Sequence, residues 1–453
     1  MKRFRTGALL AALAVSIVAV GCGRSDSGGS SSSTTADSNA KCKNVTLEAT
    51  DTGISADTIT VEVMADTGSS LAPGLFQANV DAMNAFAKYI NANGGLGCRQ
   101  LKVISWDSKL TPDEAKNGIL NACQTSAAMV GGNALFNPDT TAMGTCADKA
   151  GAATGLLNVA GLANDVNEQC NKNTWNIQGV SESCKTTSGS RTLSGFTGQV
   201  KYYQTLEPNL AGIYLVPGDL PTTVQSATVQ MAIQAQVGVK WNGAFKVSGK
   251  MEQSAFTPFI QSAKSTNSNY MYMGSNDAAM IKLRKEAAAQ GFNSKLWTCS
   301  LACYTQNFRD AGSAVDGTYV WMQFLPFEEA SYNKTLQTYV DAVGGKPDSF
   351  GAQAWQAGLL FQQAVNKIVD EKGPNGITRA SLISAAMGIT SFDAGGWATP
   401  KGPKDFGKCF VALQINGGKF TRKFPTEAGT LSCSDSNVAT VTLDPQAEAA
   451  KIS

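Results

Sequence analysis

The residues that most often perform catalysis or bind metals are scarce in this chain. Its 453 residues include no histidine, which removes the commonest general base and the commonest metal ligand of proteins. A Gly-x-Ser-x-Gly turn, which would present a nucleophilic serine, is absent as well. Paired carboxylates are the one catalytic route that stays open. Because histidine and the serine turn are both missing, we expect no catalytic residue and no cofactor.

Cysteine is the reactive residue that the chain does contain, in eleven copies. One copy, Cys22, ends an apolar N-terminal segment. The other ten form an even set, which in an exported chain favours up to five disulfides: Cys42, Cys98, Cys123, Cys146, Cys170, Cys184, Cys299, Cys303, Cys409 and Cys433. An all-thiolate metal site is the alternative, but without histidine or a C-x-x-C pair it would have to gather scattered cysteines. We expect disulfides and no metal.

The pairing of these cysteines cannot be derived from the sequence, since ten cysteines allow about 945 combinations. Five pairs are the candidates. Cys299 with Cys303 would close a short loop, and Cys409 with Cys433 would tie down the C-terminal segment. Cys123 with Cys146 and Cys170 with Cys184 are the next candidates, and Cys42 with Cys98 remains by elimination.

The first 22 residues predict export. Lys2, Arg3 and Arg5 form a positive start, and the apolar run over 8–20 is too short for a permanent membrane span. The end of the segment, Ala19-Val20-Gly21-Cys22, resembles a bacterial lipobox, which would imply cleavage before Cys22 and a diacylglycerol on its sulfur. An ordinary signal peptide that happens to contain a cysteine is the alternative.

A flexible tether is predicted behind this segment, because residues 23–39 are almost wholly small and polar. We therefore expect a lipoprotein signal peptide over 1–21 and a lipid-anchored tether over 22–56. The bilayer would be a partner through Cys22, with the protein held at the outer face of the cytoplasmic membrane.

Length and charge limit what the rest of the chain can be. At 453 residues it is too long for one ordinary core, so we expect two domains or lobes. Charged residues make up 16% and the net charge is +2, which gives no electrostatic reason to expect nucleic acid as a partner.

The segment 58–107 predicts the unit around which the fold is built. Residues 58–66 alternate apolar and polar side chains and predict a strand. A glycine-bearing loop leads to a helix that ends at Gly94-Gly95, and 101–107 predicts a second strand. A strand, a helix and a strand within about 50 residues form a βαβ unit, so the two strands should be parallel neighbours.

Strands and helices alternate along the rest of the chain as well. The first half predicts a helix from Pro112 with Thr111 as its N-cap, a helix near Pro138, and strands over 127–132 and 155–160. The second predicts helices over 191–206, 222–235, 256–264 and 277–290, with strands over 210–216, 237–247, 270–273 and 295–298. A third section predicts a strand over 317–324, helices over 332–343, 351–369 and 379–387, and a hairpin of 410–415 with 419–424, before a tail over 436–453. These are two similar α/β halves, joined by the polar segment 171–189.

Ligands of an open parallel sheet bind outside the carboxyl ends of its strands, and two such edges facing each other make a cleft. This rule selects the following candidate ligand-binding residues: Ser69, Ser70, Asn133, Ala134, Leu135, Phe136, Gly161, Asp219, Asn276, Asp277, Tyr304 and Gln323.

Each of these candidates has a plainer interpretation. Ser69 and Ser70 could be solvated turn residues. Asp277 begins a predicted helix and could cap it, or it could form a salt bridge with a cationic ligand group. Phe136 could belong to the core or to the rim of a pocket.

Several short motifs, taken in order, resemble the branched-chain amino-acid-binding type of periplasmic binding protein, over about residues 57–424. They are Ile59-Thr-Val-Glu-Val, Gly68-Ser69, Ile90-Asn-Ala-Asn-Gly-Gly95-Leu-Gly97, Leu101-Lys-Val-Ile, Trp106-Asp107-Ser108, Thr111-Pro-Asp-Glu-Ala115, the segment 270–287 with Gly291-Phe292, and Phe392-Asp393 near Gly395-Gly396.

The resemblance implies two Rossmann-like lobes, each a parallel sheet with helices on both faces, joined by a hinge of three crossings near Gly179, Phe324 and Thr399. Residues 57–179 with 325–399 would form the N-terminal lobe, and 180–324 with 400–435 the C-terminal lobe. Such a monomer would close on a small-molecule ligand and deliver it to an ABC permease. A ligand-sensing receptor of the same fold, or an exported cell-wall hydrolase, are the alternatives.

The chain departs from this family where the ligand would be held. Family members place serine and threonine hydroxyls after the third and fourth strands, where this chain has the segment 133–136 and Gly161 with Leu162. Phe76 falls near a position where the family often has an aromatic against the ligand. The resemblance thus implies an amino acid, an amide or a related compound, and the departures favour a less polar or larger ligand, with Asp277 as a partner for an amine.

Overall fold

The computed structural model describes residues 42–186 and 188–452, all within the compact unit 35–453. The expected signal peptide, the lipidation candidate Cys22 and most of the tether lie outside the described residues. Among the residues that are described, no helix combines the length and the apolar character needed to cross a membrane.

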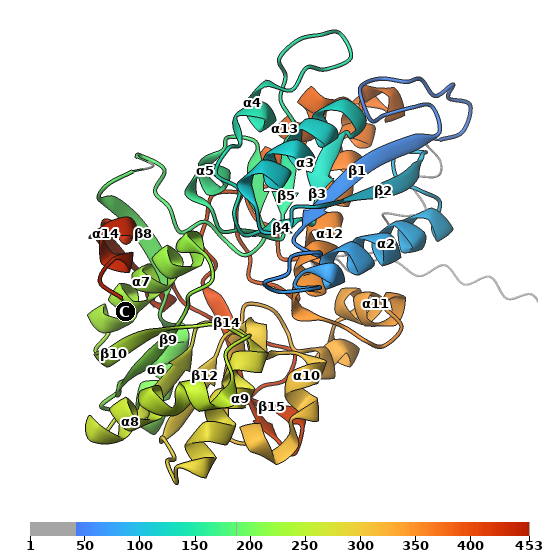
Figure 1. Cartoon of the computed structure of the whole chain (residues 1–453). Helices are drawn as coiled ribbons and strands as arrows, with labels where there is room; N and C mark the ends of the chain where they lie inside the picture. Colours follow the sequence, from blue (N-terminus) through green and yellow to red (C-terminus); the bar gives the residue numbers. More distant parts are fainter. Residues whose placement is uncertain (1–41, 187, 453) are drawn as a thin grey trace, which may run out of the picture. The chain divides into compact units, whose positions relative to one another are not determined.

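The first sheet has seven strands, all parallel, in the order β6-β4-β1-β3-β5-β7, with β2 paired to β1. Figure 1 labels β1 to β5 of this sheet in the upper part of the view. Its strands are β1 (Thr58–Ala65), β2 (Gln100–Asp107), β3 (Ala128–Val130), β4 (Asn133–Ala134), β5 (Leu157–Ala160), β6 (Leu162–Ala163) and β7 (Thr174–Asn176). The expected βαβ unit is present, because β1 and β2 pair in parallel from Thr58 with Gln100 to Ala65 with Asp107.

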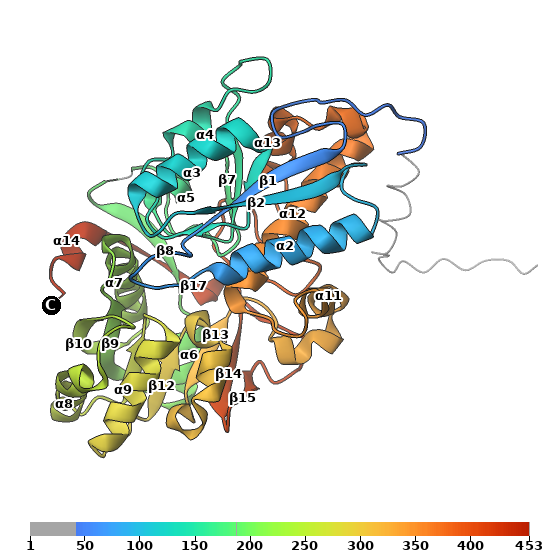
Figure 2. The same cartoon turned by 45° about the vertical axis from the view of Figure 1, so that its right-hand side comes forward.

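The alternation of side chains in β1 places helices on both faces of this sheet. Ile59, Val61 and Val63 are fully buried in the core that contains α2 (Gln77–Ala92) and α12 (Ser349–Lys372), whereas Met64 packs on the opposite face with α3 (Pro112–Thr125). Figure 2 shows α2 and α12 together on one side and α3 on the other. The remaining helices around this sheet are α4 (Thr141–Thr145), α5 (Val166–Cys170), α11 (Lys334–Ala342) and α13 (Arg379–Met387).

The second sheet has eight strands in the order β10-β9-β11-β12-β13-β14-β15, with β16 paired to β14. Its strands are β9 (Ala211–Pro217), β10 (Lys240–Val247), β11 (Tyr270–Met273), β12 (Leu296–Cys299), β13 (Tyr319–Met322), β14 (Cys409–Asn416), β15 (Lys419–Phe424) and β16 (Ser432–Cys433). Its helices are α6 (Gly198–Leu206), α7 (Pro221–Gln236), α8 (Thr257–Ser265), α9 (Asp277–Ala289) and α10 (Gln306–Asp310). The strands from β10 to β13 are parallel, and β14 with β15 forms the expected hairpin, antiparallel to β13.

The chain passes between the two sheets three times, close to Gly179, Phe324 and Thr399. The crossing segments lie against one another: Gly179 bridges to Phe406, Phe324 bridges to Ala398, and the Thr399 N–H donates to the Gln323 carbonyl at 2.9 Å. The prediction of two α/β lobes joined by three crossings is confirmed.

Two expectations about the second lobe were wrong. Residues 191–206, expected to form one helix, form the strand β8 (Arg191–Phe196) followed by α6. Part of the expected tail is also structured, because β17 (Val438–Leu443) pairs antiparallel with β8 and α14 (Pro445–Ala449) packs on α7. The local sequence could not reveal this pairing, since the two strands are about 250 residues apart and each satisfies the backbone of the other.

Within residues 42–186 and 188–452, five disulfides join the five candidate pairs. Four of their Cα–Cα distances lie between 5.3 and 6.0 Å, which suits disulfide geometry, and that of Cys409 with Cys433 is shorter, at 4.0 Å. One of them has a special position, because Cys170 ends α5 in the first lobe, whereas Cys184 follows the crossing at Gly179. This disulfide therefore spans the first crossing.

Candidate ligand-binding site

Ser69 and Ser70 lie in the loop that follows β1. Ser69 is buried, and its Oγ accepts a hydrogen bond from the Leu71 N–H at 3.1 Å, so it shapes the turn. The carbonyl oxygen of the exposed Ser70 accepts a hydrogen bond from Nζ of Lys250 in the second lobe. This loop therefore contacts the opposite lobe through its backbone.

Asn133 and Ala134 are held by groups of their own lobe, whereas the Leu135 backbone contacts both lobes. Ala134 packs in the core beneath α3. The Asn133 side chain is buried and donates to Asn79 Oδ1 at 3.5 Å, and the Leu135 N–H donates to Asp66 Oδ2 at 2.8 Å. Burial raises the pKa of the Asp66 carboxyl, although the hydrogen bonds that it accepts from the Ser108 hydroxyl and the Leu135 N–H oppose the shift.

Gly161 and Phe76 lie deeper in the first lobe than the prediction assumed. A Cβ added at Gly161 would lie 2.6 Å from Asn133 Oδ1, so the backbone approach there needs glycine. Phe76 is 2% exposed and packs edge-on against Phe350, with ring centres 4.9 Å apart. Both residues fill the lobe interior.

Tyr304 is likewise part of the interior of its lobe. Its side chain is 1% exposed, and its hydroxyl donates to the Glu328 carboxylate and accepts from the Phe327 N–H at 2.8 Å. Burial next to Glu328 raises the pKa of the hydroxyl far above its usual range.

Asn276, Asp277 and Asp219 lie at the edge of the second sheet. Asn276 is the N-cap of α9, since its Oδ1 accepts from the Ala279 N–H at 3.0 Å. Asp277 Oδ2 accepts hydrogen bonds from Thr305 Oγ1 at 2.5 Å and from Asn307 Nδ2 at 3.1 Å. Asp219 is exposed.

Phe136 and Gln323 are the two predicted residues that the structure brings to a common cavity. This cavity has a volume of about 420 Å³ and is bounded by both lobes and by the first crossing. Its walls include Phe136, Leu162 and Asn164 from the first lobe, and Thr222, Ser226, Trp321 and Gln323 from the second. A volume of a few hundred Å³ is typical of sites that hold a small organic molecule.

Two hydrogen bonds join the lobes beside this cavity. Thr222 Oγ1 donates to the Leu135 carbonyl at 3.0 Å, and Ser226 Oγ donates to Asn164 Oδ1 at 2.9 Å. Both donors belong to α7. These contacts connect the N-terminal half of α7 to the loops after β4 and β6.

A buried ion pair lines the part of the cavity near the first crossing. Arg191 Nη1 lies 2.8 Å from Glu182 Oε1, and both side chains are at most 7% exposed. Burial raises the pKa of Glu182, and the positive charge of Arg191 opposes that shift. Asp165 also lines the cavity and caps the N-terminus of α5, because its Oδ1 accepts a hydrogen bond from the Asn167 N–H at 3.0 Å. Burial raises the pKa of Asp165.

Sequence reasoning missed Arg191, Glu182 and Asn164. Glu182 fell in the segment interpreted as a linker, and Arg191 in the expected helix. The available signal was the alternation of Arg191, Leu193 and Gly195, which all face inward in β8.

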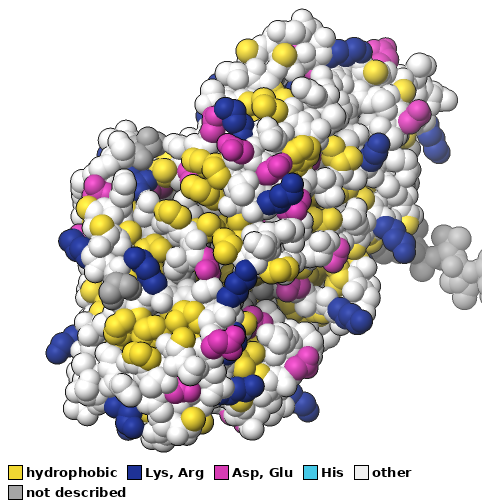
Figure 3. Space-filling view, in the orientation of Figure 1, with side chains coloured by type: hydrophobic (Ala, Val, Ile, Leu, Met, Phe, Trp, Pro, Cys, Tyr) yellow, Lys and Arg dark blue, Asp and Glu magenta, His cyan; other side chains and the backbone are white. Residues whose placement is uncertain are grey.

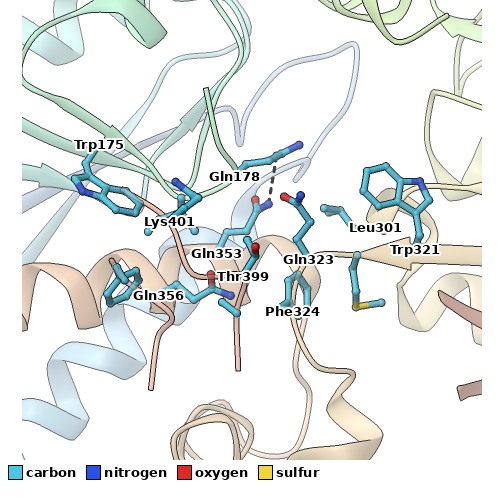
Figure 4. Close-up of a pocket in the computed structure, with 14 residues that line it drawn as sticks. Trp175, Gln178, Leu301, Trp321, Gln323, Phe324, Gln353, Gln356, Thr399 and Lys401 are labelled. Carbon is cyan, nitrogen blue, oxygen red and sulfur yellow. Dashed lines mark hydrogen bonds between the residues drawn. The ribbon is translucent and has the colours of Figure 1, made fainter. Parts of the chain in front are cut away.

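A second, much smaller cavity of about 40 Å³ lies among the crossings, and its glutamine side chains gather in Figure 4. Gln353 Nε2 donates to Gln178 Oε1 at 3.3 Å. Lys401 Nζ lies 3.9 Å from the centre of the Trp175 ring and donates to the Asn176 carbonyl. Burial lowers the pKa of Lys401 to about 7. This volume suits a few water molecules and is too small for an organic solute.

The molecular surface carries charges of both signs. On the face shown in Figure 3, Lys and Arg side chains alternate with Asp and Glu rather than forming one large patch of a single sign. A nucleic-acid site would need such a patch.

Two α/β lobes with a solute-sized cavity between them define a two-lobed ligand-binding protein. Residues 58–416 match the family model described as periplasmic binding protein, and the chain belongs to this family. The resemblance found in the motifs is thereby confirmed. A comparison with curated proteins finds no match.

Many solved structures share the fold. A leucine-binding protein from Thermotoga maritima is 12% identical, with a TM-score of 0.60 over 83% of this chain and 99% of its own. A fatty acid ABC transporter substrate-binding protein from Thermomonospora curvata is 14% identical, with a TM-score of 0.59 over 85% and 94%. An extracellular ligand-binding receptor from Rhodopseudomonas palustris is 14% identical, with a TM-score of 0.60 over 81% and 99%. At these identities the likeness concerns the fold.

Proposed function

We propose that this protein is the extracytoplasmic solute receptor of an ABC importer. It takes up a small organic solute between its lobes, closes by bending at the three crossings, and passes the solute unchanged to the membrane permease. It works as a monomer, and a lipid on Cys22 holds it at the outer face of the cytoplasmic membrane. No catalytic step is involved.

The cavity of about 420 Å³ carries this proposal. It lies between the lobes, and the first crossing forms part of its wall, so a bound molecule would touch both moving parts. A ligand that contacts both lobes in one relative position stabilises that position. Phe136, Asn164, Ser226, Trp321 and Gln323 are the side chains that we assign to solute contact.

The test has two stages. Small molecules released on denaturing the purified protein are identified by mass spectrometry, and each is then added back in a thermal-shift assay, because a ligand of the folded state raises Tm. A true ligand should also reduce the radius of gyration measured by X-ray scattering. Ligand-free protein whose Tm and radius respond to no compound across a broad metabolite panel would contradict the proposal.

A further inference from the structure

The ionisable groups around the cavity of about 420 Å³ are few, and the one cation among them is already paired. Among the described residues that line it, only Asp165, Glu182 and Arg191 carry charge, and no lysine is present. With both carboxylates ionised, these three side chains sum to one negative charge. A solute entering the cavity therefore meets no unopposed positive charge.

Arg191 is the one cation among the described residues that line the cavity, and the fold places it against Glu182. Glu182 bridges to Leu193 in the backbone of β8, two residues from Arg191, which places the two side chains next to each other. Both are buried, so the pair is poorly screened by solvent. A ligand carboxylate that displaced Glu182 would leave the Glu182 charge buried and unpaired, which is strongly unfavourable. A carboxylate that bound the buried Arg191 Nε instead would meet a guanidinium whose charge Glu182 already balances.

Neutral hydrogen-bonding groups are what the cavity offers instead. Asn164 Nδ2 is buried and has no hydrogen-bond partner among the described residues. Gln323 Nε2 donates to the Gly407 carbonyl at 3.0 Å. The side-chain oxygen of Gln323 remains as an acceptor. Buried donors of this kind are matched by carbonyl or hydroxyl oxygens of a ligand.

Apolar side chains complete the walls. Phe136 and Leu162 come from the first lobe, and Val229 and Trp321 from the second. Such walls bind the hydrocarbon or aromatic part of a solute by removing it from water.

We infer that the cavity selects an organic solute without a negative charge, one that presents amide or hydroxyl groups together with an apolar face, and rejects carboxylates and zwitterionic amino acids. This inference rests on the proposed function. A zwitterion would require an anchor for its carboxylate as well as one for its ammonium group, and the Glu182–Arg191 pair withholds the first.

The experiment compares matched amides and acids, such as benzamide with benzoate and hexanamide with hexanoate, together with leucine and phenylalanine, by isothermal titration calorimetry. We expect the wild-type chain to bind the amide of a pair at least tenfold more tightly than its acid, and to bind neither amino acid. In Glu182→Gln the guanidinium of Arg191 is released, so the acid should gain at least tenfold in affinity.

A matched control is Glu329→Gln, because the Glu329–Arg422 pair is similarly buried and does not line the cavity. It should leave the amide-to-acid ratio unchanged. Wild-type protein that binds an acid or an amino acid as tightly as the matched amide would overturn the inference while supporting solute binding. Failure of every compound, charged or neutral, together with no solute released on denaturation, would count against the proposed function itself. The wild-type comparison decides the matter even if Glu182→Gln does not fold.

Discussion

Lys401, just past the third crossing, places its ammonium 3.9 Å from the centre of the Trp175 ring, which lies just before the first crossing. The same ammonium donates to the Asn176 carbonyl. One buried cation thus connects the backbones of two crossings that are more than 200 residues apart in the chain.

Removing this cation should change how stability depends on pH. The pKa of Lys401 falls from 10.5 to about 7 on folding. Between pH 7 and the unfolded pKa, Lys401 is therefore protonated in the unfolded chain and neutral in the folded one. Because the unfolded chain binds the extra proton, the free energy of unfolding rises with pH in this range, by at most about 1.4 kcal/mol per pH unit. In Lys401→Met the free energy of unfolding should rise less steeply with pH, and the difference in slope from wild type should be close to that value. Urea unfolding at pH 6 and pH 9 measures it, with the exposed Lys408→Met as control. Equal slopes in wild type and Lys401→Met would refute the shift.

Glu62 should produce the opposite pH dependence. It is buried in β1, accepts from Asn121 Nδ2 at 2.6 Å, and its pKa is raised from 4.5 to about 7 by burial. The folded chain therefore holds a proton that the unfolded chain releases, and stability falls as pH rises from about 4.5 to 7. Glu62→Gln should be more stable than wild type by about 1–3 kcal/mol at pH 8 and about equal at pH 4.5. Chemical denaturation at the two pH values provides the comparison; a difference that does not change with pH contradicts the assignment.

Phe136→Ala should weaken solute binding with little effect on stability. Phe136 is half-buried in a loop and forms part of the cavity wall, so its truncation removes apolar contact with the solute worth about 1–2 kcal/mol, or roughly tenfold in Kd. Calorimetry with the solute identified from the purified protein gives the change. Unaltered affinity would remove Phe136 from the site.

Tyr304→Phe should lower stability and leave solute binding nearly unchanged. Its hydroxyl serves Glu328 and the Phe327 N–H inside the second lobe, so its loss should lower the free energy of unfolding by about 1–2 kcal/mol. Solute affinity should stay within twofold of wild type. A large loss of affinity at unchanged stability would return Tyr304 to the binding site, where the sequence analysis had placed it.

The disulfide across the first crossing should contribute to stability in proportion to its loop. Cys170 and Cys184 are 14 residues apart, for which loop-closure entropy predicts about 3 kcal/mol. Cys170→Ala with Cys184→Ala should lower the free energy of unfolding by that order, and the same change at Cys299 and Cys303, only 4 residues apart, by about 1 kcal/mol less. Equilibrium denaturation without reductant measures both. The reverse ranking would show that effects other than loop closure dominate.

Much of the fold could be predicted because its signals are local. The alternation of Ile59, Val61 and Val63, and the cap formed by Thr111, whose Oγ1 accepts from the Glu114 N–H, are set by residues a few positions apart. The strand β8 could not be predicted in this way, since its partner β17 lies far along the chain. Long-range pairing overrides a weak local preference.

The residues that line the candidate site could be predicted only in part, for a related reason. The rule of strand ends found Phe136 and Gln323, but it cannot tell a side chain that faces the cavity from one that faces the core, as Phe76 and Tyr304 do. It also cannot find residues such as Arg191, which reach the cavity from outside the two main sheets.

The order in which the cysteines pair has a consequence for biogenesis. From Cys42 onward, each disulfide joins a cysteine to the next one along the chain, and no two loops overlap. If thiols are oxidised as they emerge from the translocon, amino end first, the second cysteine of each pair finds its native partner as the only cysteine from Cys42 onward that is still unpaired. An oxidase alone can then assemble the complete set without reshuffling by an isomerase.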